Sequence, residues 1–413
     1  MDTKIVVGGT LIDGTGSDPI ENAIVVIEKD RITEVGQKNE VSIPKDAQTI
    51  DAAGRIIMPG LIEAHVHIRG AISMNPHMRV IESIGLQAIR SIVEARCLLE
   101  AGFTSVRDLG SAIALDLKRA IDEGMVPGPR IFAAGKYLSM TAGHGDAHDL
   151  PPTWLVDTGW SGRIADGTDE FRKAAREQLR YGADLLKVMN TGGVMSQKDH
   201  PNWPQLTIEE TKAVVEEATN VNTIVASHAQ GVQGIKNAIE AGVKTIEHGI
   251  FVDEETIEMM LKKDLILVPT FSVLNNLARI GHQHGVPDYG IRKAKETNEI
   301  HFKNIQKAIA AGVTIAAGTD FLGPEMCRHG ENAIELSYLV EAGLTPMQAI
   351  VAGTRNGALA VGPKGENLGT LEECKVADLL IVDGDPLKDI NILQEQERIK
   401  LVMKGGEIVV RRT

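Results

Sequence analysis

The sequence predicts an α/β protein, a parallel (β/α)8 TIM barrel with a small β-sandwich domain built from both ends of the chain. Three observations support this prediction. Short apolar segments rich in β-branched residues alternate with helical segments from about residue 59 to about residue 360. Most helical segments end at a glycine directly before the next strand. Both ends of the chain contain short β segments separated by turns.

Eight apolar segments are predicted as barrel strands: residues 61–67, 104–108, 130–134, 185–189, 223–229, 245–248, 265–270 and 314–320. Eight strands that alternate with helices over roughly 300 residues are typical of a closed parallel barrel, whose active site lies at the carboxyl ends of the strands. A doubly wound open sheet is the alternative, but no Gly-x-Gly-x-x-Gly motif follows an early strand to support it.

The helical segments carry clear end signals. Glycine just past a helix adopts the left-handed conformation that ends it. Six predicted helices end in this way, at Gly102, Gly124, Gly182, Gly242, Gly312 and Gly343. Two helix starts have the spacing of a capping box, Thr207 with Glu210 and Thr345 with Gln348. Pro346 follows Thr345 at the first helical position, where proline is favoured.

The two ends of the chain predict a second, smaller domain. Residues 4–57 alternate in short β segments, and residues 400–410 form a predicted hairpin around Lys404-Gly405-Gly406. Each end alone is too small to form a core. We therefore expect residues 1–58 and 361–413 to form one composite β domain beside a barrel of residues 59–360.

The composition narrows the function. Of the 413 residues, 43% are hydrophobic and 24% charged, as is usual for globular proteins. The formal net charge of −13 argues against a nucleic-acid partner. No segment is apolar enough to span a membrane, and three scattered cysteines, Cys97, Cys327 and Cys374, fit a reducing compartment. We therefore expect a cytoplasmic protein without a membrane or nucleic-acid partner.

A histidine pair ends the first predicted strand. His65 and His67 follow an apolar run, and side chains at positions i and i+2 leave the same face of a strand. Both imidazoles can therefore bind one metal ion. Such a pair also occurs on protein surfaces without any metal, so the other strand ends decide between the two interpretations.

Four further polar residues lie on predicted strands near their carboxyl ends. They are Lys187 on the fourth strand, His228 on the fifth, His248 on the sixth and Asp320 on the eighth. All are able to bind or bridge metals, and the barrel brings their strand ends together. The alternatives are hydrogen-bonded core histidines at His228 and His248, and a helix N-cap at Asp320.

Lys187 is unusual because it lies inside the apolar run 185–189. Burial disfavours an ammonium and lowers its pKa. A neutral amine can react with carbon dioxide to give a carbamate, which would convert a cation into a carboxylate-like bridge between two metals. The alternative is a lysine that extends to solvent or pairs with Asp184.

These motifs, in this order, resemble the metal-dependent amidohydrolase superfamily. The chain is most similar to the branch related to imidazolonepropionase that contains prolidase-like Xaa-Pro dipeptidases and related carboxypeptidases. The closer likeness rests on residues 104–108, 142–146 and 187–194. The resemblance covers essentially the whole chain, including the small β domain built from both ends.

The resemblance implies two divalent metal ions, with zinc as the expected metal. His65, His67 and Asp320 would hold one ion, and His228 and His248 the second. A carbon dioxide-derived carbamate on Lys187 would bridge the two ions together with a hydroxide. Paired metals lower the pKa of bound water and polarise the scissile carbonyl.

The resemblance also implies roles near the substrate. Asp320 would act as a catalytic residue that takes the proton of the attacking hydroxide and passes it to the leaving amine. His144 matches a histidine that assists near the substrate carbonyl; its alternative is a loop histidine in a glycine-rich turn. Gln230 stands where relatives have tyrosine or arginine, which weakens the case for proline specificity. Arg328, after the last strand, is a candidate for binding a substrate carboxylate.

The leading hypothesis is a binuclear metal-dependent hydrolase that cleaves the amide bond of a dipeptide, Xaa-Pro or related, or of an N-acyl amino acid. The same chemistry would serve a carbamate, a urea or a cyclic amide. A mononuclear enzyme would leave Lys187 without a bridging role. A non-catalytic scaffold would be expected to lack ligands, and none of the six is missing. Because many relatives associate, we expect a homo-oligomer.

Overall fold

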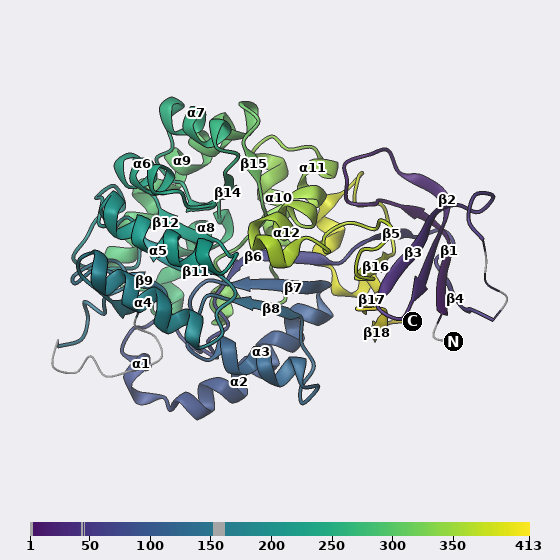
Figure 1. Ribbon diagram of the computed structural model, residues 1–413, viewed down its shortest axis with the longest axis horizontal. Helices are drawn as coiled ribbons and strands as arrows, with labels where there is room; N and C mark the ends of the chain where they lie inside the picture. Colours follow the sequence, from purple (N-terminus) through teal and green to yellow (C-terminus); the bar gives the residue numbers. More distant parts are fainter. Residues whose placement is uncertain (1–2, 43, 45, 152–161) are drawn as a thin grey trace.

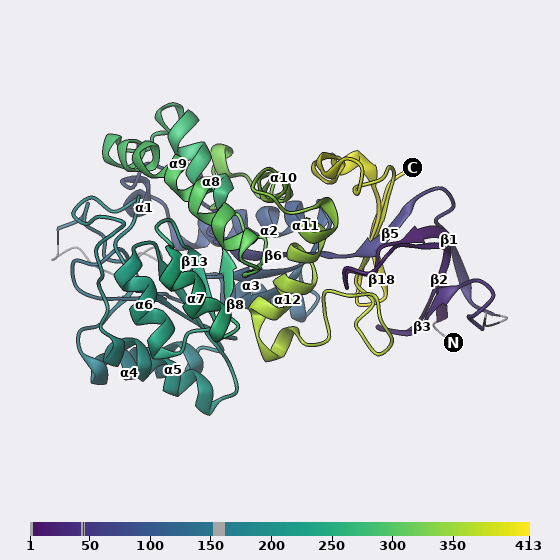
Figure 2. The same cartoon turned by 90° about the horizontal axis from the view of Figure 1, so that it is seen from above.

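The computed structural model describes residues 3–42, 44, 46–151 and 162–413. In both views, helices α4–α9 lie at one end of the molecule and a sheet of terminal strands at the other, with α10–α12 between them (Figures 1 and 2). Both marked ends of the chain lie beside this terminal sheet (Figure 1). None of the helices in the described ranges is long and apolar enough to cross a membrane.

The terminal sheet joins strands from the two ends of the chain. It consists of β1 (Thr3–Leu11), β2 (Ile20–Glu28), β3 (Arg31–Gln37), β4 (Gln48–Asp51), β5 (Ile56–Pro59), β16 (Leu379–Val382), β17 (Ile399–Lys404) and β18 (Glu407–Arg411). Strand β5 is the junction, because it pairs in parallel with β1 and antiparallel with β16. Val6, Ile57 and Leu379 belong to the apolar cluster that these strands bury together.

The remaining strands form two parallel sheets. One contains β6 (Leu61–Val66), β7 (Phe103–Asp108) and β8 (Arg130–Ala133). The other has the order β10 (Arg163–Ile164), β9 (Leu138–Ser139), β11 (Leu186–Met189), β12 (Val225–Ala229), β13 (Thr245–His248), β14 (Ile266–Val268) and β15 (Thr314–Ile315). This arrangement confirms the predicted α/β class with parallel strands.

Backbone hydrogen bonds connect the two parallel sheets at both edges. On one side, the amide of Asp184 donates to the carbonyl oxygen of Ala133 at 2.8 Å. On the other side, the amide of Ala64 donates to Ala317 at 2.9 Å, and the amide of Asp320 donates to His65 at 2.7 Å. The segment after β15 therefore lies directly beside β6.

Each predicted strand has a counterpart in the structure, with two differences. The eighth is only two residues long, since beyond Ala316 the chain leaves the ladder with β14, and the carbonyl oxygen of Ala317 and the amide of Asp320 bond to the backbone of β6 instead. The short strands β9 and β10 were not predicted, because two-residue strands carry no periodic signal.

Helices connect and cover the parallel strands. The described helices are α1 (Met78–Ile81), α2 (Ile84–Glu100), α3 (Ala114–Asp122), α4 (Thr168–Arg180), α5 (Ile208–Asn220), α6 (Val232–Ala241), α7 (Glu254–Lys262), α8 (Phe271–Ile280), α9 (Asp288–Ala310), α10 (Ile334–Glu341), α11 (Pro346–Ala352) and α12 (Arg355–Val361). Short 3-10 turns are η2 (Gly281–His284), η3 (Glu325–Cys327), η4 (Pro363–Gly365), η5 (Ile390–Gln394) and η6 (Gln396–Arg398). Both predicted capping boxes are present, at Thr207 and Thr345.

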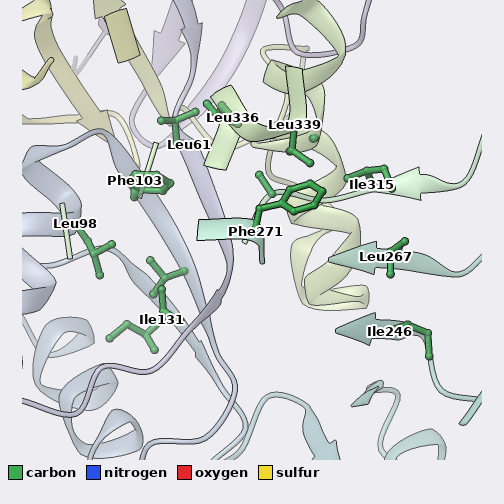
Figure 3. Close-up of a cluster of buried hydrophobic side chains, with 14 of the residues drawn as sticks. Leu61, Leu98, Phe103, Ile131, Ile246, Leu267, Phe271, Ile315, Leu336 and Leu339 are labelled. Carbon is green, nitrogen blue, oxygen red and sulfur yellow. The ribbon is translucent and has the colours of Figure 1, made fainter. Parts of the chain in front are cut away.

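The main core lies between the parallel strands and the helices. Figure 3 shows part of it, with strand residues Leu61, Phe103, Ile131, Ile246, Leu267 and Ile315 and helix residues Leu98, Phe271, Leu336 and Leu339. All are buried, so each of these side chains contributes roughly 1.5–3 kcal/mol of transfer free energy. This packing fixes the strand ends on which the polar residues lie.

Candidate metal centre and active site

One cavity collects the six predicted metal-binding residues. Its volume is about 160 Å³, and its lining includes His65, His67, Lys187, His228, His248 and Asp320. These residues belong to, or directly follow, β6, β11, β12, β13 and β15. The cavity therefore lies at the carboxyl ends of parallel strands, the position that the fold favours for an active site.

The donor atoms lie within reach of a common ion. One donor atom each of His65, His248 and Asp320 lies within 4.8 Å of the other two. Asp320 Oδ1 is 3.1 Å from Nε2 of His67 and 3.5 Å from Nε2 of His65. The rings of His228 and His248 have centroids 4.6 Å apart. The six side chains thus form one continuous cluster once Lys187, which faces the same cavity, is included.

The backbone is strained at two of these positions. His248 has a φ of 73° and Asp320 a φ of 57°, a left-handed region that side chains other than glycine rarely adopt. Such conformations cost roughly 1–3 kcal/mol each and persist where the surroundings require them. Here the unusual turns bring both donors into the cavity.

Three of the four histidines meet an oxygen atom at one ring nitrogen, whereas Nδ1 of the fourth, His67, lies 3.1 Å from the guanidinium Nη2 of Arg69. His65 Nδ1 lies 2.8 Å from Glu247 Oε2, and His248 Nδ1 lies 2.7 Å from Thr270 Oγ1. His228 Nε2 contacts a backbone carbonyl oxygen at 3.1 Å. Histidines that bind metals are usually oriented in this way, which leaves the second nitrogen available as a ligand.

Glu247 is itself fixed by a buried arginine. Arg107 of β7 is fully buried and donates from Nη2 to Glu247 Oε1 at 2.7 Å. Its remaining N–H groups reach the carbonyl oxygens of Ala64 and Ala360 and the hydroxyl of Thr245. Arg107 lies within residues 104–108, for which the sequence predicted a strand and no side-chain role. The sequence does contain an indication of this pair, because Arg107 and Glu247 are opposite charges inside two predicted barrel strands, 104–108 and 245–248.

The side chain of Lys187, unlike that of Arg107, is buried without a hydrogen bond to the described residues. Its residue is 1% exposed, and Nζ has no hydrogen-bond partner among the described residues. Burial lowers the pKa of Lys187 to about 8, although Glu247 and Asp320 act in the other direction. Roughly a tenth of the amine is therefore neutral at pH 7, and this is the form that carbamate formation requires. An unpartnered amine amid histidines and a carboxylate fits a donor set for two metal ions.

The other donors have the protonation states that a divalent ion requires. Burial lowers the pKa values of His65, His228 and His248 well below the usual value, so these imidazoles are neutral. Burial alone would raise the pKa of Asp320, but the neighbouring His65, His67 and Lys187 outweigh it and lower that pKa to about 2. Neutral imidazoles and an ionised carboxylate are the forms that bind metal.

Two of the three predicted substrate contacts line the cavity. His144 stacks on His228 with ring centroids 4.3 Å apart, and its Nδ1 lies 2.7 Å from Ser196 Oγ. Burial lowers the pKa of His144 to about 4. Gln230 is 5% exposed, and its Oε1 accepts no hydrogen bond within the described part of the chain.

Arg328, the third predicted substrate contact, does not line the cavity. Its side chain is 56% exposed and lies 3.9 and 4.0 Å from Glu325 and Glu331, outside the cavity lining. The preceding turn η3 buries Met326 and Cys327 and leaves Arg328 on the outside. The arginine and lysine side chains that do line the cavity, among the described residues, are those of Arg69 and Lys187.

An apolar wall completes the cavity. It is formed by Met74, Val194, Ile250, Val273, Leu274 and Leu277, all members of one buried cluster. Three of these residues lie on α8 and the others on loops. Periodicity does not show which apolar residues of a helix face a cavity rather than the core, so this wall could not be predicted from the sequence.

Comparison with known proteins agrees with this geometry. The family model described as Amidohydrolase family matches residues 56–409. An ochratoxinase of Aspergillus niger is 37% identical over 430 aligned residues, covering 98% of this chain and 86% of the relative. The crystal structure of A. niger ochratoxinase superposes with a TM-score of 0.90 at 35% identity, covering 100% of this chain and 96% of that one.

A second similar solved structure is a complex with a ligand. It is a prolidase complexed with N-methylphosphonate-L-proline, with a TM-score of 0.91 and 35% identity, covering 99% of this chain and 100% of that one. Members of the matched family are generally metal-dependent, in agreement with the cluster of histidines and Asp320. The chain therefore belongs to the Amidohydrolase family, among the prolidase-like members of the amidohydrolase superfamily, and is a hydrolase that acts on carbon–nitrogen amide bonds.

Proposed function

We propose that this protein is a binuclear, zinc-dependent hydrolase that cleaves the amide bond of a small dipeptide or an N-acyl amino acid. Residues 59–360 would close into one (β/α)8 barrel. Residues 1–58 and 361–413 would form the flanking β-sandwich domain. The backbone hydrogen bonds at both edges of the parallel sheets support closure of the barrel.

The observation that carries the proposal is the state of Lys187. A buried amine without a hydrogen-bond partner costs several kcal/mol unless the group has another task. As a carbamate, Lys187 would gain two oxygen ligands and remove that cost. In this assignment His65, His67 and Asp320 would hold one ion, His228 and His248 would hold the other, and a carbamate on Lys187 would serve both.

When bound, such a pair of ions lowers the pKa of water and polarises a carbonyl. Side chains of the cavity would transfer the proton and orient the substrate. Asp320 is ionised at neutral pH, so its carboxylate can accept the proton of the attacking water and pass it to the leaving nitrogen. His144 and Gln230 line the same cavity and would orient the scissile group.

The shape of the cavity supports a compact substrate with an apolar part. One side presents the polar cluster and the other the wall of α8, Met74, Val194 and Ile250. An apolar side chain or acyl group against this wall would place its amide bond at the polar cluster. The names of the relatives, an ochratoxinase and a prolidase, agree with amide substrates.

A substrate library tests the proposal directly. Zinc-loaded protein is incubated with dipeptides and N-acyl amino acids, including Xaa-Pro members, and released amino acid is measured. We expect turnover with apolar members, abolished in Asp320→Asn. Turnover confined to carbamates, ureas or cyclic amides would replace the proposed substrate class, and no turnover of any amide would refute it.

A further inference from the structure

A chain of buried hydrogen bonds lies behind His144. Its Nδ1 is 2.7 Å from the hydroxyl of Ser196, and that hydroxyl donates to Oδ1 of Asp199. Ser196 and Asp199 are 6% and 7% exposed. Both belong to the loop after β11, whereas His144 lies in the loop after β9. The contact therefore joins two loops at the mouth of the cavity.

Lys293 of α9 holds the loop that carries Ser196 and Asp199. Its Nζ donates to the carbonyl oxygens of Gly193, Ser196 and Asp199 at 3.0, 2.6 and 2.6 Å, and lies 3.3 Å from Asp199 Oδ1. The residue is 4% exposed. A buried ammonium that meets three backbone carbonyls of one short loop fixes the conformation of that loop.

Gln205 forms hydrogen bonds with both Asp199 and the backbone of His144. Its Nε2 donates to Asp199 Oδ2 at 2.9 Å, and its Oε1 accepts from the backbone amide of His144 at 2.9 Å. Both carboxylate oxygens of Asp199 are thereby engaged. The backbone and the ring of His144 are tied to the same carboxylate by two independent routes.

The available protons determine the tautomer of His144. A serine hydroxyl has one hydrogen to donate. Asp199 Oδ1 is the ionised acceptor of that hydrogen, and the weaker second contact of the hydroxyl, the carbonyl oxygen of Gly193 at 3.3 Å, is also an acceptor. The hydroxyl must therefore accept from His144, whose Nδ1 carries the hydrogen. In the neutral ring Nε2 is then an acceptor.

The ring fits against a glycine that leaves no room for a side chain. A Cβ at Gly193 would lie 2.1 Å from Cε1 and 2.3 Å from Nδ1 of His144. Stacking on His228 covers the ring as well. These contacts restrict the orientation of the imidazole, so Nδ1 stays directed at Ser196.

We propose that Ser196, Asp199 and Lys293 are positioning residues that hold His144 as its Nδ1–H tautomer and present Nε2 to the cavity as a hydrogen-bond acceptor. This inference rests on the proposed function of the cavity as an amide hydrolase site. The tautomer also specifies the hydrogen bond that His144 can make in the cavity. Because Nε2 is an acceptor, the group that contacts it must be a donor, either a substrate N–H or water.

Nuclear magnetic resonance of the imidazole nitrogens tests the tautomer without any turnover. Full-length zinc-loaded protein is labelled with [15N]histidine, and the signals of His144 are assigned by their loss in His144→Ala. We expect protonated Nδ1 in the wild type and in Ser196→Thr, which keeps the hydroxyl. Ser196→Ala and Lys293→Met should give a mixture of tautomers. A protonated Nε2 in the wild type would overturn the proposal.

A double-mutant cycle tests the consequence for catalysis. With the best amide substrate, Ser196→Ala should lower kcat about tenfold with little change in KM, the effect of one hydrogen bond. The same substitution should have no further effect in His144→Ala. Ser91→Ala removes another buried hydroxyl, in α2, and should leave kcat unchanged. Equal effects of Ser196→Ala in both backgrounds would refute the positioning role, whereas absence of any amide turnover would refute the proposed function and leave the tautomer result standing.

Discussion

Lys187 and Arg107 are both buried cations, yet their surroundings differ completely. Arg107 meets Glu247, a hydroxyl and two carbonyl oxygens, so its charge is compensated within the protein. Lys187 meets no such partner in the described residues. A compensated charge serves structure, whereas an uncompensated amine in a cavity points to chemistry.

The first prediction at this scale concerns Arg107. Arg107→Met leaves the carboxylate of Glu247 buried without its cation, so we expect a loss of about 3–5 kcal/mol in the free energy of unfolding. Urea denaturation of the metal-free protein measures it. Arg119→Met, which breaks an exposed pair with Glu123, should leave the free energy of unfolding nearly unchanged. Equal stabilities for the two variants would contradict the structural role of Arg107.

The second prediction concerns Lys187. Lys187→Ala should lower the metal content below two ions per chain and reduce kcat more than about 100-fold, because the bridge is missing. Added acetate should restore part of the activity, since a small carboxylate can occupy the vacated position. Unchanged metal content and kcat in this variant would argue against a bridging carbamate.

Helix ends were the elements that the sequence predicted best. All six glycines predicted to end helices have positive φ, between 73° and 117°. Capping boxes at Thr207 and Thr345 also formed as predicted. These signals are local, because they depend on the chain conformation within a few residues. The length of β15 was predicted wrongly, since it depends on hydrogen bonds to β6, more than 200 residues away in the chain.

The third prediction tests one of these caps. Thr345→Ala removes the hydroxyl that accepts from the amide of Gln348, so the free energy of unfolding should fall by about 1 kcal/mol. Thr345→Ser keeps the hydroxyl and should retain most of the stability. Denaturation midpoints measure both variants, and kcat should be unchanged in each. A larger loss for Thr345→Ser than for Thr345→Ala would contradict the capping role.

The fourth prediction concerns the start of α8, where Glu335 of α10 accepts from the amides of Phe271 and Ser272. Burial raises the pKa of Glu335 from 4.5 to about 7. The folded state therefore keeps a proton that the unfolded state releases, and this stabilisation is full below pH 4.5 and is lost as the pH rises to about 7. This shift in the pKa of Glu335 corresponds to about 3 kcal/mol in the free energy of unfolding.

Glu335→Gln removes this titration. Unfolding measured between pH 4.5 and 7 should show a smaller decline of stability with pH in the variant than in the wild type. Glu341→Gln, which changes an exposed carboxylate at the end of the same helix, is the matched control and should keep the wild-type slope. Parallel slopes for Glu335→Gln and the wild type would refute the assignment.

At the scale of the whole molecule, the polar cluster could be predicted because parallel strands bring their carboxyl ends together. Residues as distant in sequence as His65 and Asp320 approach within 3.5 Å for that reason. The substrate side could not be predicted in the same way. It is built from α8 and from long loops, whose paths are set by tertiary contacts such as those of Lys293. Arg328 illustrates the limit, since its side chain is exposed although it directly follows the buried Met326 and Cys327 of η3.

The central claim is that six side chains from five strand ends together hold a pair of metal ions. Elemental analysis of protein produced with zinc and then desalted tests it most directly. We predict two zinc ions per chain in the wild type and fewer in His65→Asn, with circular dichroism showing that the variant remains folded. A wild-type protein that is folded but contains no zinc would contradict the account.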